Sequence, residues 1–421
     1  MLNFKEKIKK DIKDNLNQQY IKRFLSIAAR KPLLMLLGTT FKSASDRLLN
    51  MYSMEAMGKA YNTANPVAYG SLFLPYELFH GLGLVPFLPE VIAGFAAGMG
   101  IAEKTLKQAN SKWYSPDLCT FHRSASGAVE LDLFPRPQAI IVTNLACDAA
   151  QKSFYIYAKE FGLEKNFYFL DVPYHYDEDS VLYLSGQLKK ISKDICSNLK
   201  ISMDMHRMGQ AIEYSNQFRH WAIQTNNTRK KLYSYPPDYN GLNFILPFHS
   251  MAGTKEAVTL YKKMHQELEF FRRNQPDSNN KKRLIWLHLK PYYKNEIFDL
   301  LDQGGCMLAF EEISHVYWPK LDPQKPFRSL AIKILSHFFR GSVENRTRIA
   351  AFLAQEYSAH GAIFFSHWGC RQNNGAARII KDKLKEIGIP TLSIDGDCVD
   401  KNNYSRGQLA TRIQAFTELL G

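Results

Sequence analysis

The sequence predicts an α/β protein with two Rossmann-like, doubly wound parallel-sheet units, a helical subdomain and an N-terminal helical extension. In two separate parts of the chain, short apolar runs alternate with helical stretches, as expected for strands that are buried on both faces of a parallel sheet. Between these parts the apolar runs disappear and only charged, amphipathic segments remain. With 421 residues the chain is long enough for two or three domains with their own cores.

We divide the chain where the pattern changes. Residues 1–66 form the N-terminal helical extension, residues 67–180 the first α/β domain, residues 181–282 the helical subdomain with its linker, and residues 283–421 the second α/β domain. An Asn-Pro pair ends the extension, because these residues favour turns over helix. The linker is the polar run at 272–282, whose composition does not suit a packed element.

The individual elements follow from the same pattern. Six short apolar runs are predicted to be strands, at residues 139–142, 167–170, 284–287, 307–310, 362–365 and 391–394. Four amphipathic segments are predicted to be helices, at residues 148–161, 186–199, 255–271 and 376–387. The first two strands and the helix between them have the spacing of a βαβ unit, which predicts parallel pairing.

Charge and hydropathy limit the possible partners. The formal net charge is +14, and the first 50 residues hold eleven Lys or Arg against four Asp or Glu. A basic arm is compatible with nucleic acid or a membrane surface. We favour an amphipathic extension that packs on the domain or on a partner subunit, and we expect no nucleic-acid binding. The longest apolar stretch, residues 85–102, is interrupted by prolines and Glu90, so we expect no membrane span.

The cysteines are expected to be free thiols. The first 13 residues are charged and lack the pattern of a secretory signal, so we expect a cytoplasmic protein. Six cysteines in a chain of this size do not make a disulfide framework, and a reducing cytosol would keep them as thiols.

Cys370 has the most informative surroundings. It follows the predicted strand at 362–365 and precedes a helix, and open α/β sheets bind their ligands at such strand ends. The N-terminus of a helix also favours a thiolate over a thiol. Cys119 and Cys147 have similar settings. Three thiolates from three strand-to-helix junctions could hold an iron–sulfur cluster with one iron left open.

The segments around these cysteines also match a known family. Four patterns occur in the family's order: Asp117-Leu118-Cys119 with Arg123, residues 144–148 ending in Cys147-Asp148, Gly369-Cys370-Arg371, and residues 388–397 followed by Gln408, Thr411, Arg412 and Phe416. With these patterns the chain resembles the 2-hydroxyacyl-CoA dehydratase family, which also contains the core subunits of ATP-dependent benzoyl-CoA reductase. The resemblance covers the chain from about Val67 to its end.

This resemblance implies an oxygen-sensitive lyase subunit. It implies a [4Fe-4S] cluster held by Cys119, Cys147 and Cys370, an acyl-CoA substrate, and a second dehydratase-like subunit in a heterodimer or a homodimer. A separate ATP-dependent iron–sulfur activator would supply one electron to the thioester of an (R)-2-hydroxyacyl-CoA. The resulting ketyl radical would lose its 2-hydroxyl group. The positive net charge suits the phosphates of coenzyme A.

Two alternatives remain open within this resemblance. The chain could be a benzoyl-CoA-reductase-like subunit, or a non-catalytic subunit that relays electrons to its partner. An occupied fourth iron site with no route for acyl-CoA would favour the relay, and a polar cleft that exposes the open iron beside Glu90 would favour the catalytic subunit. The chain has no Gly-x-x-x-x-Gly-Lys-[Ser/Thr] phosphate loop, so we expect no Walker-type ATPase activity of its own.

Glu90 and Ser71 are the candidate catalytic residues. Glu90 matches a Pro-Glu pattern that relatives place at the reaction centre, and its apolar surroundings predict a raised pKa that suits proton transfer. Ser71 stands where the family has a serine or cysteine near the cluster. The alternatives are a buried structural carboxylate for Glu90 and a helix cap for Ser71. Because Ser71 and Ser314 occupy positions where some relatives carry extra cysteines, we expect a single cubane.

Three other residues near these motifs allow two interpretations each. Arg123 and Arg371 could stabilise the cluster charge or bind a phosphate or carboxylate. His367 could donate to a substrate, although packing or a backbone hydrogen bond is the favoured reading. Three further cysteines have no matched context and are expected to be ordinary thiols: Cys196, Cys306 and Cys398.

Overall fold

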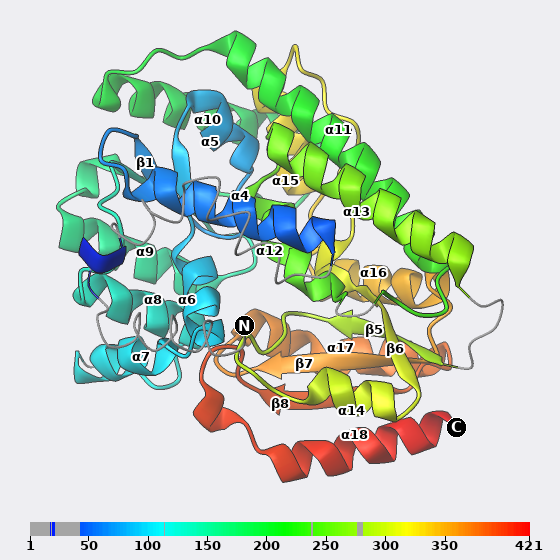
Figure 1. Ribbon diagram of the computed structural model, residues 1–421. Helices are drawn as coiled ribbons and strands as arrows, with labels where there is room; N and C mark the ends of the chain where they lie inside the picture. Colours follow the sequence, from blue (N-terminus) through cyan, green and yellow to red (C-terminus); the bar gives the residue numbers. More distant parts are fainter. Residues whose placement is uncertain (1–16, 18, 22–42, 113, 237–238, 276–280) are drawn as a thin grey trace.

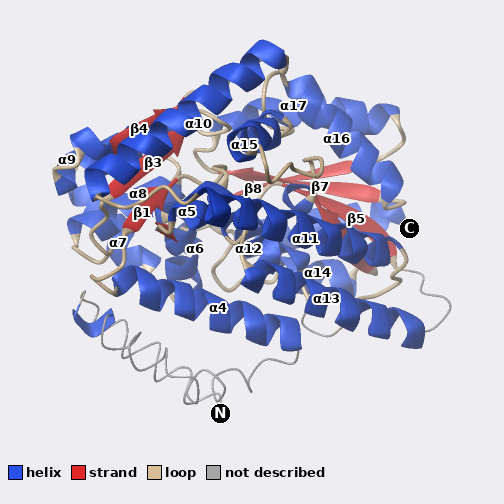
Figure 2. Cartoon of the chain, turned by 90° about the horizontal axis from the view of Figure 1, so that it is seen from above, coloured by secondary structure: helices blue, strands red, loops and turns tan. Residues whose placement is uncertain are grey.

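The computed structural model describes residues 17, 19–21, 43–112, 114–236, 239–275 and 281–421. In these residues the chain forms two four-stranded parallel sheets surrounded by helices, which confirms the predicted fold class. The two sheets lie in separate halves of the molecule (Figure 2). The main described helix of the N-terminal extension is α4 (Ala44–Tyr61). Its N-cap residue is Ser43, whose side chain accepts a hydrogen bond from the backbone N–H of Asp46. Most of the remaining predicted helices of this extension lie outside the described residues.

The first sheet has the strand order β2-β1-β3-β4. Its strands are β1 (Val67–Gly70), β2 (Val85–Phe87), β3 (Ala139–Thr143) and β4 (Phe167–Leu170). The surrounding helices are α5 (Tyr76–Leu82), α6 (Pro89–Gly98), α7 (Ala102–Ser111), α8 (Thr120–Glu130), α9 (Asp148–Phe161) and the short η1 (Glu164–Asn166). Alternate residues of β3 enter two different cores, because successive side chains of a strand point to opposite faces. Ile140 and Val142 pack with α8 and α9, whereas Ile141 packs with α5 and α10.

The second sheet repeats this arrangement, with the order β6-β5-β7-β8. Its strands are β5 (Lys282–Leu287), β6 (Cys306–Glu311), β7 (Gly361–His367) and β8 (Thr391–Gly396). Its helices are α14 (Ile297–Gln303), η3 (Glu312–Ser314), α15 (Pro326–Leu335), α16 (Val343–Glu356), α17 (Arg371–Glu386), η4 (Lys401–Asn403) and α18 (Arg406–Leu420). Helices α14 and α18 cover one face of the sheet, and α16 and α17 cover the other (Figure 1).

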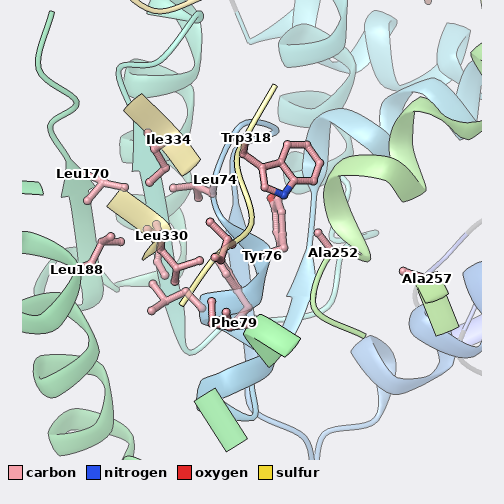
Figure 3. Close-up of a cluster of buried hydrophobic side chains, with 14 of the residues drawn as sticks. Leu74, Tyr76, Phe79, Leu170, Leu188, Ala252, Ala257, Trp318, Leu330 and Ile334 are labelled. Atoms are coloured by element: carbon pink, nitrogen blue, oxygen red, sulfur yellow. The ribbon is translucent and has the colours of Figure 1, made fainter. Parts of the chain in front are cut away.

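Between the two sheets, the described residues form helices and the loops that join them. The helices are α10 (Glu178–Leu199), α11 (Met205–Lys230), η2 (Gly241–Phe244), α12 (Ile245–Ser250) and α13 (Lys255–Asn274). Helix α13 extends three residues into the segment predicted to be a linker. A large apolar cluster joins these helices to α5 and α15, and Figure 3 shows Phe79, Leu188, Trp318 and Leu330 in it. The C-terminal part of the chain therefore packs on the helical region as well as on its own sheet.

The predicted strands and helices are all present, but several details differ, and one of them is that α10 begins at Glu178, eight residues before the predicted start. Strands β1 and β2 were not predicted, because each has only three or four residues and β2 contains Pro86, which is tolerated at a sheet edge. Helix α17 begins at Arg371, five residues before the predicted start. Cys119 follows the loop after α7, so the prediction that it follows a strand was wrong. No helix in the described part of the chain is long and apolar enough to cross a membrane.

A buried ion pair holds three elements together at the carboxyl end of the second sheet. Arg346 of α16 donates two hydrogen bonds of 2.8 Å to the carboxylate of Glu312. It donates a third, also 2.8 Å long, to Asn373 of α17, and the backbone N–H of His288 donates to Glu312 at 3.3 Å. Both charged side chains are almost completely buried. The network therefore fixes the loop after β5 against α16 and α17.

We predict that Glu312→Ala destabilises the protein by about 3–5 kcal/mol, because it leaves the Arg346 guanidinium buried without its carboxylate. Urea denaturation of the variant and the wild type measures this difference. The matched control is Glu178→Ala, which removes a solvent-exposed ion pair with Arg328 and should change the denaturation midpoint little. Equal effects of the two substitutions would contradict the structural role of the buried pair.

Candidate functional site

The site lies where the strand order of both sheets reverses direction. In each unit the chain continues from the central strand to opposite sides, so the reversal falls between β1 and β3 and between β5 and β7. Parallel α/β sheets bind ligands outside the carboxyl ends of such strands. Ser71 follows β1, Cys147 follows the loop after β3, His288 follows β5 and Cys370 lies three residues after β7. Both sheets thus contribute the same topological position to one site.

Each of the three predicted ligand cysteines is the N-cap residue of a helix. Cys119 precedes α8, Cys147 precedes α9 and Cys370 precedes α17. Backbone N–H groups of the first turn act on each sulfur and lower its pKa. Burial is the larger effect and raises the pKa of all three thiols, that of Cys119 well above its ordinary value. Without a cation these side chains are therefore neutral thiols.

The three cysteines line one cavity of about 90 Å³ together with Glu90 and Ser71. No three His, Cys, Asp or Glu side chains among the residues described come together closely enough to hold a single metal ion. Ligands of different irons in a cluster are further apart than ligands of one ion. Three N-cap thiols around one buried cavity are a donor set that suits an iron–sulfur cluster, because thiolates ligate iron and helix N-termini stabilise negative charge.

Gly369 brings the two sheet units into contact at this cavity. Its φ angle is +78°, and a Cβ atom at this position would lie 2.6 Å from the backbone nitrogen of Cys119 and 2.8 Å from its Cα atom. A side chain would clash with the backbone, and the left-handed conformation also favours glycine. A second contact, 3.2 Å long, joins Arg371 of α17 to Asp148 of α9. The backbone contact at Gly369 therefore fixes the N-termini of α8 and α17 to each other, and the exposed pair of Arg371 and Asp148 shows that the N-terminus of α9 lies beside them.

Backbone strain is also present at the site. Two of the residues with left-handed backbone conformation other than glycine are Ala146, directly before Cys147, and His288. Such conformations cost of order 1–3 kcal/mol each and persist where the surrounding structure enforces them. Here they turn the chain at the ends of strands β3 and β5 toward the cavity.

Glu90 lies in the first turn of α6 and has few polar partners. Its Oε2 atom accepts a 2.9 Å hydrogen bond from the backbone N–H of Leu72, and its Oε1 atom lies 3.6 Å from Nε2 of His122. Burial raises the pKa of Glu90 from its ordinary value of 4.5 to about 8 and lowers the pKa of His122 to about 4. At neutral pH the pair is consequently a carboxylic acid beside a neutral imidazole, and Glu90 holds a proton facing the cavity.

Ser71 does not cap the following helix. The N-cap residue of α5 is Pro75, and the Ser71 hydroxyl instead accepts a 3.3 Å hydrogen bond from the backbone N–H of Thr143. This contact joins the ends of β1 and β3 at the cavity wall. Because the hydroxyl accepts in this contact, its own hydrogen remains available for donation.

A histidine contacts each of the three cysteines. The Nε2 atom of His367 lies 3.2 Å from the sulfur of Cys119, that of His122 lies 3.3 Å from Cys147, and that of His288 lies 3.6 Å from Cys370. Of these three histidines, only His367 was named as a candidate from the sequence. The other two were missed because no sequence pattern links a histidine to a cysteine 25 or 82 residues away.

The two arginines named from the sequence are bound to other groups. Arg123 is buried and donates to the carbonyl of Pro116 at 2.9 Å and to Asn110 at 3.0 Å. It therefore holds the loop before Cys119. Arg371 is exposed and pairs with the Asp148 carboxylate, as one of its two readings expected.

The other cysteines have different positions. Cys196 lies in α10 and Cys306 begins β6, so both are remote from the N-cap cysteines in the fold. Cys398 is completely buried in the loop after β8, where burial and, after it, the charge of Asp397 raise its pKa well above the ordinary value. Its backbone N–H donates to Nδ1 of His367.

With this geometry in place, comparisons with known proteins define the class. A family model described as "2-hydroxyglutaryl-CoA dehydratase, D-component" matches residues 71–420. The chain belongs to this family. The resemblance predicted from the sequence is thereby confirmed.

Individual relatives are distant but cover nearly the whole chain. The (R)-phenyllactyl-CoA dehydratase alpha subunit of Clostridium sporogenes is 22% identical over 82% of this chain and 87% of its own length. The (R)-2-hydroxyisocaproyl-CoA dehydratase alpha subunit of Clostridioides difficile is 24% identical, with 86% and 92% covered. A benzoyl-CoA reductase subunit of Thauera aromatica is 20% identical, with 89% and 91% covered.

The raised pKa of Glu90 predicts a pH-dependent stability in the metal-free protein. Between about pH 4.5 and 8 the folded state keeps a proton that the unfolded state has released. This stabilising contribution is complete below about pH 4.5 and is lost as the pH rises through 8. Glu90→Gln has no such proton. Its free energy of unfolding should gain on that of the wild type by a few kcal/mol from pH 5 to pH 8, since one pKa unit corresponds to about 1.4 kcal/mol.

Urea denaturation at several pH values measures this difference. Ser71→Ala is the matched control, because it alters the same cavity wall without removing the carboxyl group, and its stability should follow the wild-type pH dependence. Parallel stability curves for Glu90→Gln and the wild type would show that the Glu90 carboxyl is ordinary and ionised.

Proposed function

We propose that this chain is a subunit of an oxygen-sensitive, cytoplasmic (R)-2-hydroxyacyl-CoA dehydratase, a lyase that holds one [4Fe-4S] cluster on Cys119, Cys147 and Cys370. The observation that carries the proposal is the convergence of three N-cap thiols on one buried cavity beside a protonated carboxyl group. The names of the dehydratase relatives supply the reaction class. When bound, such a cluster supplies one electron at low potential and an open iron that acts as a Lewis acid.

The residues of the chain prepare the reaction in three ways. Backbone N–H groups of α8, α9 and α17 stabilise the negative charge of the sulfurs. Phe73 and Phe121 help to line the cavity and exclude water, which protects a radical on the substrate from side reactions. Glu90 exchanges a proton with the reacting carbon skeleton through its carboxyl oxygen, and Ser71 donates its hydroxyl hydrogen to the group that leaves.

Two larger cavities adjoin this site and favour a catalytic subunit over an electron relay. A cavity of about 740 Å³ is lined by apolar residues of α4, β2 and α6 and shares Val91 and Tyr292 with the site. We propose that the acyl chain approaches along this wall. A second cavity, of about 510 Å³, shares Cys147, Phe339 and Gln372 with the site. Both cavities border the one that Glu90 lines, and a subunit that only relays electrons has no need of them.

The chain is proposed to act with partners. The dehydratase relatives are named alpha subunits, which supports a second dehydratase-like subunit in a heterodimer, with a homodimer as the alternative. Because the sequence lacks a phosphate loop, ATP hydrolysis is assigned to a separate iron–sulfur activator. The substrate is an acyl-CoA thioester.

A benzoyl-CoA-reductase-like activity is the second candidate. The relative from Thauera aromatica, which is named a reductase subunit, favours it. The two activities differ in their products, since a dehydratase releases an enoyl-CoA and water whereas a reductase keeps the electrons in the product. Product analysis with both substrate types under anaerobic, ATP-supplied conditions distinguishes them.

The proposed cluster predicts a definite iron content. Anaerobically purified protein should contain about four irons and four sulfides per chain. Cys119→Ala, Cys147→Ala or Cys370→Ala should remove a ligand and reduce the iron content sharply. Cys196→Ala is the matched control and should retain the wild-type iron content, because this thiol lies in α10. Stoichiometric zinc without iron would contradict the proposal.

The proposed proton transfer predicts a slower reaction when Glu90 loses its carboxyl group. Glu90→Gln should slow dehydration by ~10²–10⁴, the usual contribution of general acid–base catalysis, while iron content and acyl-CoA affinity stay close to wild type. Ser71→Ala should have a smaller effect. Steady-state rates are measured beside iron content and thermal midpoint for each variant. A Glu90→Gln rate within a factor of about three of wild type would make Glu90 a structural carboxyl group.

A further inference from the structure

We propose that His367 is a positioning residue whose Nε2–H group donates a hydrogen bond to the sulfur of Cys119 and thereby raises the reduction potential of the cluster. This inference rests on the proposed function, because it concerns a thiolate that is bound to iron. It assigns a role to the side chain that ends β7 in one sheet unit and contacts the first helix-capping cysteine of the other.

The tautomer of His367 follows from its two contacts. The backbone N–H of Cys398 donates to Nδ1 at 3.1 Å, so this nitrogen accepts and carries no hydrogen. The hydrogen of the ring is consequently on Nε2, which lies 3.2 Å from the sulfur of Cys119. Both side chains are buried, with exposed fractions of 1% and 8%, so water does not compete for this contact.

The opposite tautomer would need Nδ1 to donate to Asp397, and the geometry opposes it. The distance from Nδ1 to Oδ1 of Asp397 is 3.9 Å, which is too long for a hydrogen bond. That oxygen already accepts from the Thr120 hydroxyl at 2.6 Å and from the backbone N–H groups of Val399 and Asp400 at 2.8 and 3.0 Å. Asp397 is thus fully occupied in holding the loop that presents the N–H of Cys398.

The ring of His367 is also held in place by its neighbours. It stacks on the ring of His288, with centroids 6.2 Å apart and planes 21° apart, and it meets the edge of Phe121 at 5.2 Å. His122 and His288 contact the other two cysteines, but the Nδ1 atom of each is buried without a hydrogen-bond partner. Only for His367, of these three, do the described contacts determine which nitrogen carries the hydrogen.

A donor at this position changes the energy of electron uptake. Reduction adds negative charge to the cluster and its sulfur ligands, and hydrogen bonds to the sulfurs are among the factors that set the potential. The hydrogen bond from His367 is stronger in the reduced state, because its acceptor is more negative. The protein therefore makes electron uptake from the activator easier without placing a positive charge in the site.

The test compares two substitutions in the full chain, with its partner subunit where purification retains it. His367→Leu removes the donor, whereas His367→Gln keeps an N–H group for Cys119 and an oxygen for the N–H of Cys398. His265→Leu is the control, because it removes an imidazole that lies between α11 and α13 against Trp221. Iron content and the midpoint potential from an EPR-monitored redox titration are measured for each protein.

We expect the equilibrium constant for one-electron reduction to fall about tenfold or more in His367→Leu, which corresponds to a downward shift of about 59 mV. His367→Gln should restore most of this shift, and His265→Leu should cause none. An iron-loaded His367→Leu protein with the wild-type potential would overturn the inference alone. Absence of iron from the wild type would overturn the proposed function, and the inference with it.

A second measurement covers the case in which His367→Leu fails to retain iron. In metal-free protein labelled with [¹⁵N]histidine, two-bond ¹H–¹⁵N correlations assign the tautomer of each ring, and His367→Gln identifies the His367 signals. A hydrogen on Nε2 supports the inference. A hydrogen on Nδ1 contradicts it, because Nε2 could then only accept from the thiol.

Discussion

The contact on which the site depends is the close approach of Gly369 to the backbone of Cys119. It sets the N-terminus of α17, which carries Cys370, against that of α8, and so adds a backbone junction to two sheet units that also share an apolar cluster, in which Phe121 packs with Trp286 and Phe365. The N-terminus of α9 lies beside that of α17, where Asp148 and Arg371 form an exposed ion pair. Only glycine fits at the contact, because any Cβ atom would overlap the backbone of Cys119. The cavity, its thiols and its histidines all follow from this one junction.

The same burial gives the cysteines and Glu90 their chemical character. Removal from water makes a negative charge costly, so burial raises the pKa values of the three thiols and of the carboxyl group alike. For the thiols, backbone N–H groups at the helix N-termini lower this cost, and a bound metal would lower it further. Glu90 accepts only one backbone hydrogen bond and keeps its proton. One apolar cavity can thereby hold three charged ligands and one neutral acid.

Local patterns in the sequence were sufficient for much of this architecture. The strand at 167–170 and the helix at 148–161 have the predicted bounds in the structure, because long apolar runs and amphipathic periods are local signals. Strand β2 escaped prediction because its three residues include a proline and pair only at an edge. The boundaries of the four proposed domains remain predictions. Cys119, Cys147, Cys370, Glu90 and Ser71 were named from motifs, and the structure brings all five to one cavity.

What the sequence could not provide is the contacts between distant segments. His288 and Cys370 are 82 residues apart, and Cys119 and His367 are 248 residues apart. Their pairing depends on how the two sheets face one another, which no local period encodes. Arg123 shows the reverse case: its motif pointed to the cluster, but its guanidinium holds the loop before Cys119. A residue beside a ligand in sequence can thus serve the ligand's backbone instead of its charge.

The most direct test of the account is the Mössbauer spectrum of the ⁵⁷Fe-loaded protein under anaerobic conditions. Three cysteine ligands on a four-iron cluster predict iron sites in a three-to-one ratio, with the single site changing its parameters when acyl-CoA is added. Four equivalent iron sites whose parameters do not change when acyl-CoA is added would contradict the account. The spectrum of a mononuclear iron would contradict it as well.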